Sequence, residues 1–310
     1  MSTPILFDCD PGHDDAIALL LALASPEIQV LGVTTVAGNT TLPKTTANAL
    51  RVLELAGRGD IALAAGCDRP LVRELVVAEH VHGQTGLDGP MLPAPIGAAI
   101  SIHAVDFLAG QIGAAHTPVT LVPVGPLTNI AMLLSRYPGI EENVKEIVLM
   151  GGAIGTGNVT PAAEFNIYVD PEAAHRVFHC GIPLTMIGLD VTHRALLDQS
   201  HAEELRGSGA IGKFVAELLD FFITHHPRSY ATRSGVPIHD ALAVAHLIWP
   251  DLVTTEHVAV TVDTESRLCR GRTVVDLWGV TSATPNARVG TEVNSAVFAR
   301  SLLDRLTSLD

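Results

Sequence analysis

The feature that most constrains this chain is a cluster of aspartates near its N-terminus. Four fall within eight residues, directly after the apolar run at residues 4–7, and they are Asp8, Asp10, Asp14 and Asp15. Like charges this close repel one another and are costly to bury, and the first Lys or Arg of the chain is Lys44. A bound metal ion would supply the missing counter-charge, and an all-oxygen ligand set suits a hard cation such as Ca²⁺ or Mg²⁺. The dipole at the start of a helix is the simpler explanation for Asp14 and Asp15 taken alone.

Strand-like apolar runs alternate with helical patterns along most of the chain. We expect strands at residues 5–8, 30–36, 61–64, 119–124, 146–150 and 184–188, and helices near residues 14–24, 43–56, 98–114, 126–135 and 171–180. This alternation is typical of βαβ units and predicts an α/β fold with a mainly parallel sheet. The length of 310 residues allows one large domain or two ordinary ones, and no low-complexity linker divides the chain.

The remaining segments are less regular. Residues 75–95 are rich in glycine and polar groups, and we expect a long loop that is functional or mobile. Residues 196–224 have a helical pattern, and the irregular stretch 225–237 could form a lid. Towards the end of the chain, residues 256–262, 272–277 and 287–289 suggest short antiparallel strands, and residues 295–307 suggest a closing helix.

The charge balance bears on the kind of partner. The chain has 33 acidic and 19 basic residues, a net charge of −14, which argues against nucleic acid and anionic membranes as partners. A neutral small molecule fits better. We find neither a signal peptide nor a membrane span and expect a cytoplasmic protein. The four cysteines are scattered without a CxxC pair, which favours reduced thiols and no zinc site.

Further polar residues follow predicted strands, and parallel sheets bind ligands beyond the carboxyl ends of their strands. Asn39 follows the second strand, although on its own it is more simply the N-cap of the next helix. Val124 ends the fourth strand, and its segment offers no side-chain ligand before Thr128. Met150 leads into a glycine-rich stretch that lacks both the ending of a phosphate-binding P-loop and a clean dinucleotide-binding motif.

Two later patterns also attract attention. Glu164 and Asn166 alternate around Phe165, so in an extended chain they would project together and could bind hydroxyl groups; an amphipathic edge strand explains the pattern as well. Asp240 opens an apolar helix, as Asp14 does. Two such helix starts make sense if both point at one cation, although an N-cap explains Asp240 alone equally well.

The motif Asp8-x-Asp10-Pro11-Gly12-x-Asp14-Asp15-Ala16 resembles the N-terminal signature of the inosine-uridine-type nucleoside hydrolases. These enzymes depend on calcium and cleave ribonucleosides to ribose and free base. The resemblance extends from Asp8 to Asp240 and implies a single α/β domain over residues 1–310, with an open, mostly parallel β-sheet flanked by helices. It also implies a ribonucleoside substrate, Ca²⁺ as cofactor, and a homodimer or homotetramer.

The resemblance further implies roles for individual residues. Calcium would be held by Asp10, Asp15, Asp240 and the carbonyl of Val124, leaving positions for two ribose hydroxyls and a water. Asp10 would remove a proton from this water, with Asn39 nearby. The side chains that would contact the sugar or line the substrate site are Asp14, Met150, Asn158, Glu164, Phe165 and Asn166.

The leaving base would need protonation or a hydrogen bond. His82 and His239 are the best candidates because they coincide with family positions, and His226 and Tyr230 come next. Asp8, closest to the strand, would support the loop or act from behind the metal ligands.

Two other functions remain open. A haloacid-dehalogenase-type phosphatase also uses Asp-x-Asp after its first strand with Mg²⁺, but its motif continues to a Thr where this chain has Gly12. A calcium-stabilised nucleoside-binding protein would bind the same ligand without consuming it.

Overall fold

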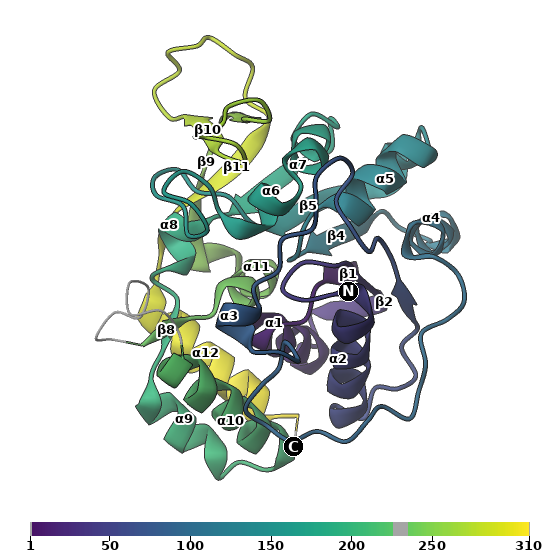
Figure 1. The fold of residues 1–310 in the computed structure, drawn as a ribbon, viewed down its shortest axis with the longest axis vertical. Helices are drawn as coiled ribbons and strands as arrows, with labels where there is room; N and C mark the ends of the chain where they lie inside the picture. Colours follow the sequence, from purple (N-terminus) through teal and green to yellow (C-terminus); the bar gives the residue numbers. More distant parts are fainter. Residues whose placement is uncertain (1, 226–234, 310) are drawn as a thin grey trace.

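A computed structural model of the chain describes residues 2–225 and 235–309. In this described part, nine strands form one sheet in the order β10-β9-β11-β6-β5-β4-β1-β2-β3, and β7 and β8 form a small antiparallel pair (Figure 1). The strands are β1 (Thr3–Cys9), β2 (Ile28–Thr35), β3 (Leu63–Ala65), β4 (Val119–Pro123), β5 (Val144–Met150), β6 (Leu184–Ile187), β7 (Leu196–Leu197), β8 (Val236–Pro237), β9 (Val253–Val262), β10 (Thr273–Asp276) and β11 (Ala287–Val293). In this spatial order, every pair of neighbours from β11 to β3 is parallel. Strand β9 is antiparallel to both β11 and β10. The predicted α/β fold with a mostly parallel open sheet is confirmed.

The helices alternate with the strands through the first two thirds of the chain. They are α1 (His13–Ala24), α2 (Leu42–Leu55), α3 (Glu79–His82), α4 (Ala104–Ala114), α5 (Thr128–Arg136), α6 (Phe165–Val169), α7 (Pro171–Phe178), α8 (Leu189–Thr192), α9 (Gln199–Arg206), α10 (Ala210–His225), α11 (His239–Ile248) and α12 (Ser295–Thr307), with 3-10 turns η1 (Ile140–Asn143) and η2 (Pro250–Leu252). Local chemistry explains several starts. Asp170 caps α7, which begins with Pro171, and Asn294 caps α12.

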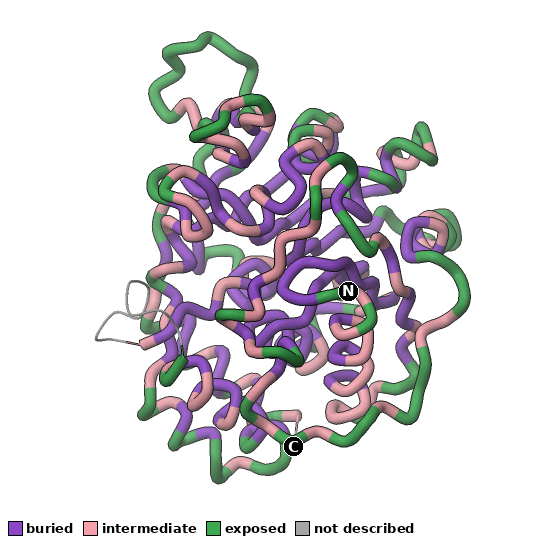
Figure 2. The backbone as a smooth tube through the Cα atoms, in the orientation of Figure 1, coloured by how far each residue is buried: buried purple, intermediate pink, exposed green. Residues whose placement is uncertain are grey.

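Each face of the sheet packs against its own set of helices. Alternate residues of β1 enter different hydrophobic clusters: Ile5 and Phe7 join α1, α2 and α9 to α12, whereas Leu6 joins α4, α5 and α7. Figure 2 shows the resulting buried centre, with exposed backbone confined mainly to loops and outer helix faces. Helix α1 is buried over ten of its twelve residues, because strand β2 and helices α2, α10, α11 and α12 pack around it. The acidic motif is therefore held inside the molecule.

Several element boundaries differ from those expected. The helix expected from residue 98 begins at Ala104, where Nδ1 of His103 accepts a hydrogen bond from the backbone of Val105. The helical stretch expected at 196–224 opens with β7 and is divided between α9 and α10, with Gly207 following α9. The expected loop at 75–95 contains the short helix α3.

The strands and the helix at the C-terminal end are of the predicted types, but the strands differ in length from those predicted. The closing helix has the expected bounds, and β9 pairs in antiparallel fashion with β10 and β11. Strand β9 has ten residues, however, and β11 extends to Val293, so this part is longer than the short strands predicted. No helix within residues 2–225 and 235–309 has the length and apolar character needed to cross a membrane.

The topology brings distant polar residues to one edge. β1 pairs with β2 and β4, and β4 with β5, all in parallel, so their carboxyl ends lie at the same edge of the sheet. Asp10, Asn39 and Val124 follow the first three of these strands, and Met150 ends the fourth. Loops at this edge are where open α/β sheets bind ligands, so the fold itself places a candidate site here.

Candidate active site

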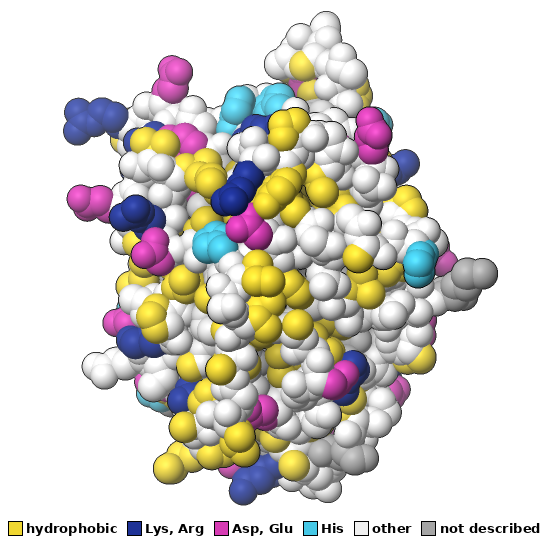
Figure 3. All heavy atoms as spheres, turned by 90° about the vertical axis from the view of Figure 1, so that its right-hand side faces the viewer, with side chains coloured by type: hydrophobic (Ala, Val, Ile, Leu, Met, Phe, Trp, Pro, Cys, Tyr) yellow, Lys and Arg dark blue, Asp and Glu magenta, His cyan; other side chains and the backbone are white. Residues whose placement is uncertain are grey.

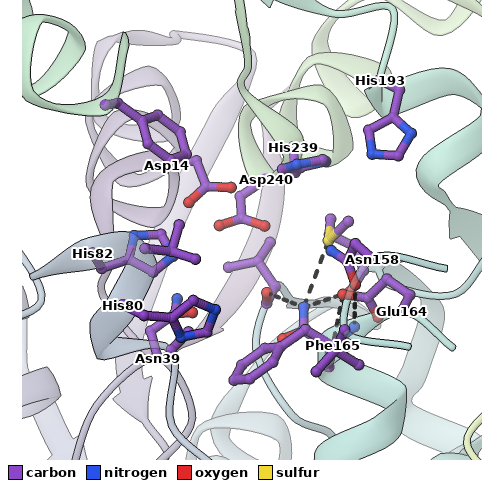
Figure 4. A pocket seen from close by; sticks show the side chains of 17 residues that line it. Asp14, Asn39, His80, His82, Asn158, Glu164, Phe165, His193, His239 and Asp240 are labelled. Atoms are coloured by element: carbon purple, nitrogen blue, oxygen red, sulfur yellow. Dashed lines mark hydrogen bonds between the residues drawn. The ribbon is translucent and has the colours of Figure 1, made fainter. Parts of the chain in front are cut away.

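The aspartate cluster is completed by a residue from the far end of the chain. Helix α1 carries Asp14 and Asp15 in its first turn, and α11, which packs against α1, carries Asp240 in its own first turn. Carboxylate oxygens of these three buried residues all lie within 4.8 Å of one another. Figure 4 shows the Asp14 and Asp240 carboxylates pointing towards each other at the centre of a cavity. The first turns of α1 and α11 therefore bring their carboxylates to one place, where they could hold a metal ion.

Burial and mutual repulsion both disfavour the charged form of this cluster. Burial, followed by repulsion from Asp15, raises the pKa of Asp14 to about 8. Burial also raises the pKa of Asp10 and of Asp240 well above the ordinary value, with neighbouring aspartates adding to the shift. No Lys or Arg is among the described residues that line the cavity. A cation is the counter-charge that this cluster lacks.

Asp10 provides the clearest indication that a cation fits. Its Oδ2 accepts a hydrogen bond of 2.6 Å from the backbone N–H of Asn39, whereas its Oδ1 is buried and has no hydrogen-bond partner among the described residues. The space around this carboxylate requires glycine: a Cβ at Gly125 would lie 2.3 Å from Oδ1, and one at Gly38 would lie 2.1 Å from Oδ2. An acceptor oxygen held in this way, beside three further carboxylates, suits an oxygen-seeking ion such as Ca²⁺.

Asp15 shapes the motif as well as contributing to the cluster. Its Oδ1 accepts a hydrogen bond from the backbone N–H of Asp10, and its Oδ2 accepts from the backbone N–H of Gly12 and the amide of Asn39, each at 3.0 Å. These bonds fold the loop between β1 and α1 back on itself. The N-cap explanation for Asn39 is wrong, because Thr41 is the N-cap of α2 and the amide of Asn39 binds inside the acidic motif.

Asp8 lies on the other side of the motif and does not line the cavity. Its Oδ1 accepts a hydrogen bond of 2.5 Å from the hydroxyl of Thr34 on β2 and one of 2.8 Å from the amide of Asn129 on α5. Burial raises the pKa of Asp8 to about 7, although both hydrogen bonds oppose that shift. These contacts join three elements beneath the motif, as expected for a supporting residue.

The cavity gathers most of the residues predicted for the substrate site. The predicted residues that line it are Asp14, Asn39, His82, Val124, Met150, Asn158, Glu164, Phe165, Asn166, His239 and Asp240. Asp10 and Asp15 are fully buried next to two of these, Asn39 and Asp14. His226 and Tyr230 lie outside the described residues.

The conformation expected around Phe165 is wrong. Residues 165–169 form α6, and Glu164 is its N-cap, so Glu164 and Asn166 do not project together from an extended strand. The Glu164 carboxylate accepts hydrogen bonds of 2.9 Å from the backbone N–H of Asn166 and 3.0 Å from that of Gly152. A capping carboxylate satisfies N–H groups at the helix start that an extended chain would leave to other partners. Burial raises the pKa of Glu164 to about 7.

Asn166 joins the ends of two strands. Its amide donates to the carbonyl of Val124 after β4 at 2.7 Å and to that of Met150 at the end of β5 at 3.2 Å. Asn158 accepts a hydrogen bond of 2.9 Å from the backbone N–H of Phe165 (Figure 4). The glycine-rich stretch after β5 thus carries Asn158 to the cavity rather than forming a phosphate loop.

Histidines stand on both sides of the carboxylates. In Figure 4, His80 and His82 lie on one side of Asp14 and Asp240, and His193 and His239 lie on the other. Nδ1 of His239 is 2.7 Å from the hydroxyl of Thr192, and its ring meets that of His193 edge-on at 5.5 Å. Burial lowers the pKa of His193, which favours its neutral form. The cavity therefore offers ring nitrogens at two places around a bound molecule.

Sequence reasoning missed several lining residues, chiefly His80, His193 and Phe222. His193 follows β6 at the same sheet edge as the other polar clusters, so the rule applied to Asn39 could have found it. His80 lies two positions before His82, and nothing in its pattern distinguishes it from a surface histidine. Phe222 lies on α10, where apolar periodicity predicts only a core residue.

Comparison with known proteins agrees with this geometry. Residues 5–300 match the family model described as inosine-uridine preferring nucleoside hydrolase. The chain is 51% identical over 299 residues to the pyrimidine-specific ribonucleoside hydrolase RihA of Shewanella woodyi, covering 96% of each chain. It is 49% identical to the RihA of Escherichia coli O9:H4, covering 99% of each. Among solved structures, the purine-preferring ribonucleoside hydrolase from Gardnerella vaginalis superposes with a TM-score of 0.93 at 34% identity, covering 99% of each chain. The chain therefore belongs to the inosine-uridine preferring nucleoside hydrolase family and is a ribonucleoside hydrolase.

Proposed function

We propose that this enzyme is a calcium-dependent hydrolase that cleaves the N-glycosidic bond of pyrimidine ribonucleosides. The observation that carries the calcium dependence is the buried Oδ1 of Asp10, which lacks a hydrogen-bond partner among the described residues beside the cluster of Asp14, Asp15 and Asp240. Unpaired buried carboxylate oxygens are costly unless a cation or proton satisfies them.

Four groups would hold the calcium ion: the carboxylates of Asp10, Asp15 and Asp240, and the carbonyl of Val124. The bound ion supplies Lewis-acid polarisation of an attacking water and neutralises the clustered negative charge. The carbonyl oxygen of Val124 accepts a hydrogen bond from the amide of Asn166. A carbonyl oxygen has a second lone pair, which could bind the calcium ion.

Asp10 is the proposed general base. Its Oδ2 accepts a hydrogen bond from the backbone N–H of Asn39, and a nearby cation favours the ionised form of the carboxylate, which can accept a proton from the water. The amide of Asn39 donates to the Asp10 carbonyl at 3.2 Å, which fixes Asn39 beside the place where the water would attack.

The sugar would be held on the side of the cavity formed by α1 and by the segment around α6. Asp14 from α1 would bind a ribose hydroxyl. Asn158, Glu164 and Asn166 lie opposite it in the cavity, as Figure 4 shows for Asp14, Asn158 and Glu164. Met150 and Phe165 line the same cavity as apolar surface. Carboxylates arranged around the sugar favour the positive charge that develops on it as the bond to the base breaks.

The base would lie between the two groups of histidines. His82 and His239 are the proposed donors to the departing base, since an imidazole can give a proton at neutral pH. His226 and Tyr230 remain candidates that lie outside the described residues.

Preference for pyrimidines rests on the relatives that are about half identical over nearly the whole chain, whereas the purine-preferring structure is 34% identical. The test is ribose release from uridine, cytidine, inosine and adenosine, with and without chelator. We expect kcat/KM for uridine and cytidine to exceed that for the purine nucleosides by about 100-fold. Equal values would contradict the preference, and full activity after exhaustive chelation would contradict the calcium requirement.

We also propose that residues 1–310 act as one domain within a homodimer or homotetramer in the cytoplasm. Both hydrophobic clusters pack on one continuous sheet, and the four cysteines are free thiols, as in a reducing compartment.

Apolar side chains gather on the face in Figure 3, along which residues 91–102 run, and Met91 and Ile96 are 96% and 97% exposed. Light scattering would test the assembly.

A further inference from the structure

A pair of contacting histidines connects the acidic motif with the cavity. We propose that His13 is a positioning residue for protonation of the leaving base: it holds Nδ1 of His82, so that Nε2 of His82 is the ring nitrogen that serves the base. This inference rests on the proposed function, which assigns a donor role to His82 and none to His13.

The contacts define which nitrogen of His82 faces which partner. Nδ1 of His82 lies 3.0 Å from Nδ1 of His13 and accepts a hydrogen bond of 3.3 Å from the backbone N–H of His13. His13 is fully buried and does not line the cavity, whereas His82 does. Because Nδ1 of His82 is engaged by His13, Nε2 is the nitrogen through which His82 can act on a bound base.

The position of the protons follows from a third contact. Nε2 of His13 lies 2.8 Å from the carbonyl oxygen of Asp88. A carbonyl oxygen only accepts hydrogen bonds, so Nε2 of His13 carries a hydrogen. The two Nδ1 atoms at 3.0 Å require one hydrogen between them, since two facing lone pairs would repel. A further hydrogen on Nε2 of His82 makes the pair a donor towards the cavity.

The hydrogen that the base takes up comes from the histidine pair. When the glycosidic bond breaks, its electron pair goes to the base, which takes the hydrogen from Nε2 of His82. The shared hydrogen then passes from Nδ1 of His13 to Nδ1 of His82, which gives up the hydrogen bond from the backbone N–H of His13 and donates to Nδ1 of His13 instead. The attacking water gives its proton to Asp10, so the enzyme neither gains nor loses a proton in total. Solvent returns one proton to the histidine pair and removes one from Asp10.

Two features hold His13 in place. Its ring stacks on Phe221, with centroids 5.1 Å apart and planes 6° apart, and on Phe222 at 5.2 Å and 12°. The carboxylate of Asp88 accepts the backbone N–H groups of Gln84 and Thr85 at 3.0 and 3.1 Å, which fixes the turn that presents the Asp88 carbonyl. The ring can neither tilt nor rotate freely, so its nitrogens keep their partners.

Gly12 permits the close approach of His82 to the motif. A Cβ at position 12 would lie 2.6 Å from Nδ1 of His82 and 2.9 Å from the amide of Asn39. Any side chain there would force the histidine away. The glycine of the acidic motif thus serves the leaving-group side of the cavity as well as the turn before α1.

The test compares two leaving groups. His13→Phe keeps an aromatic ring in the stack and removes both ring nitrogens. Uracil needs a proton to depart from uridine, whereas the nitrophenolate of 4-nitrophenyl riboside departs unaided. We expect His13→Phe to lower kcat for uridine by about 100-fold and kcat for the nitrophenyl riboside by less than about fivefold. An equal loss on both substrates would overturn the inference.

Two amide variants separate the contacts of His13. The amide of His13→Asn sits near the position of Nδ1 and keeps the contact with His82, so it should recover most of the uridine activity. The amide of His13→Gln reaches the position of Nε2 and keeps only the contact with Asp88, so it should not. These two buried polar variants decide the question even if His13→Phe folds poorly, and recovery by Gln instead of Asn would contradict the assignment.

A double variant and two physical measurements complete the experiment. In a His82→Phe background, His13→Phe should cause less than about a twofold further loss, whereas additive losses would show that His13 acts independently of His82. Calcium titration calorimetry should give similar binding for wild type and His13→Asn. Nitrogen-15 spectra of the wild type should show a hydrogen on Nε2 of His82, and its absence would overturn the inference. If the wild type releases no ribose from uridine, the proposed function fails first.

Discussion

The hydroxyl of Thr192 lies 2.7 Å from Nδ1 of His239, although the two residues come from different helices, α8 and α11. Thr192 is fully buried, so its hydroxyl has a fixed place from which to orient the imidazole. Orientation of a proton donor by a neighbouring group is a recurrent requirement of acid catalysis.

Replacing Thr192 with Val keeps the shape and removes this contact. We expect kcat for uridine to fall by about tenfold, because the His239 ring loses the partner that sets its orientation. Thr192→Ser retains the hydroxyl and is the matched control, which should stay within about twofold of the wild type. Steady-state kinetics of the two variants will measure the difference, and equal losses would assign the effect to packing.

Asp10→Asn removes the proposed general base and one metal ligand while preserving shape. We expect ribose release to fall by more than about 10³-fold, since base and ligand are lost together. Removal of one buried charge from a repelling cluster should also raise the melting temperature of the chelated protein. A reducing-sugar assay measures the loss of ribose release, and calorimetry of the chelated protein measures the melting temperature. Near-normal turnover would refute the assignment of Asp10.

Gly125→Ala tests the space around Asp10 without changing any charge. The added Cβ would lie 2.3 Å from Oδ1 of Asp10 and 3.2 Å from its backbone nitrogen, so the carboxylate must move. Calcium affinity should fall by at least about tenfold, as judged by titration calorimetry. The control is Gly110→Ala on α4, where a Cβ meets no atom within 4 Å and calcium affinity should not change.

The stability of the metal-free protein should depend on pH through Glu164. Burial raises its pKa from 4.5 to about 7 in the folded state, so between these values the unfolded chain ionises while the folded chain keeps its proton. Stability is therefore greatest below about pH 4.5 with respect to this group and falls as the pH rises towards 7, by about 3 kcal/mol at most.

Glu164→Gln should flatten this part of the profile in chelated protein, measured by urea unfolding between pH 5 and 8. The control Glu265→Gln, at an exposed glutamate, should keep the wild-type slope. An unchanged slope in Glu164→Gln would show that Glu164 keeps its charge in the folded protein.

Local sequence patterns could predict part of this site, whereas contacts between residues far apart in the chain could not be predicted. Asp14 and Asp240 could be placed together because each opens an apolar helix and both match motif positions of the nucleoside hydrolases. The bonds of Asp8 to Thr34 and Asn129 could not, because they depend on which strand lies beside β1 and on its register.

Short elements explain the main error. Glu164 and Asn166 show one alternation around Phe165, and two residues cannot distinguish a strand from a helix of five residues such as α6. The hydrogen bonds that the Glu164 carboxylate accepts at the start of α6 favour the helix over the strand. His13 occupies a position that the motif leaves unspecified. Its contact with His82 joins residues 69 positions apart in the chain, so only the folded structure reveals it.

The pairing of α1 with α11 also determines when the site can exist during synthesis. Asp15 leaves the ribosome early, and Asp240 follows only when more than three quarters of the 310 residues have been made. A nascent chain, or one truncated before position 240, holds the N-terminal aspartates without the carboxylate that completes their cluster. Such a chain would gain no stabilisation from an ion that needs the whole set of carboxylates.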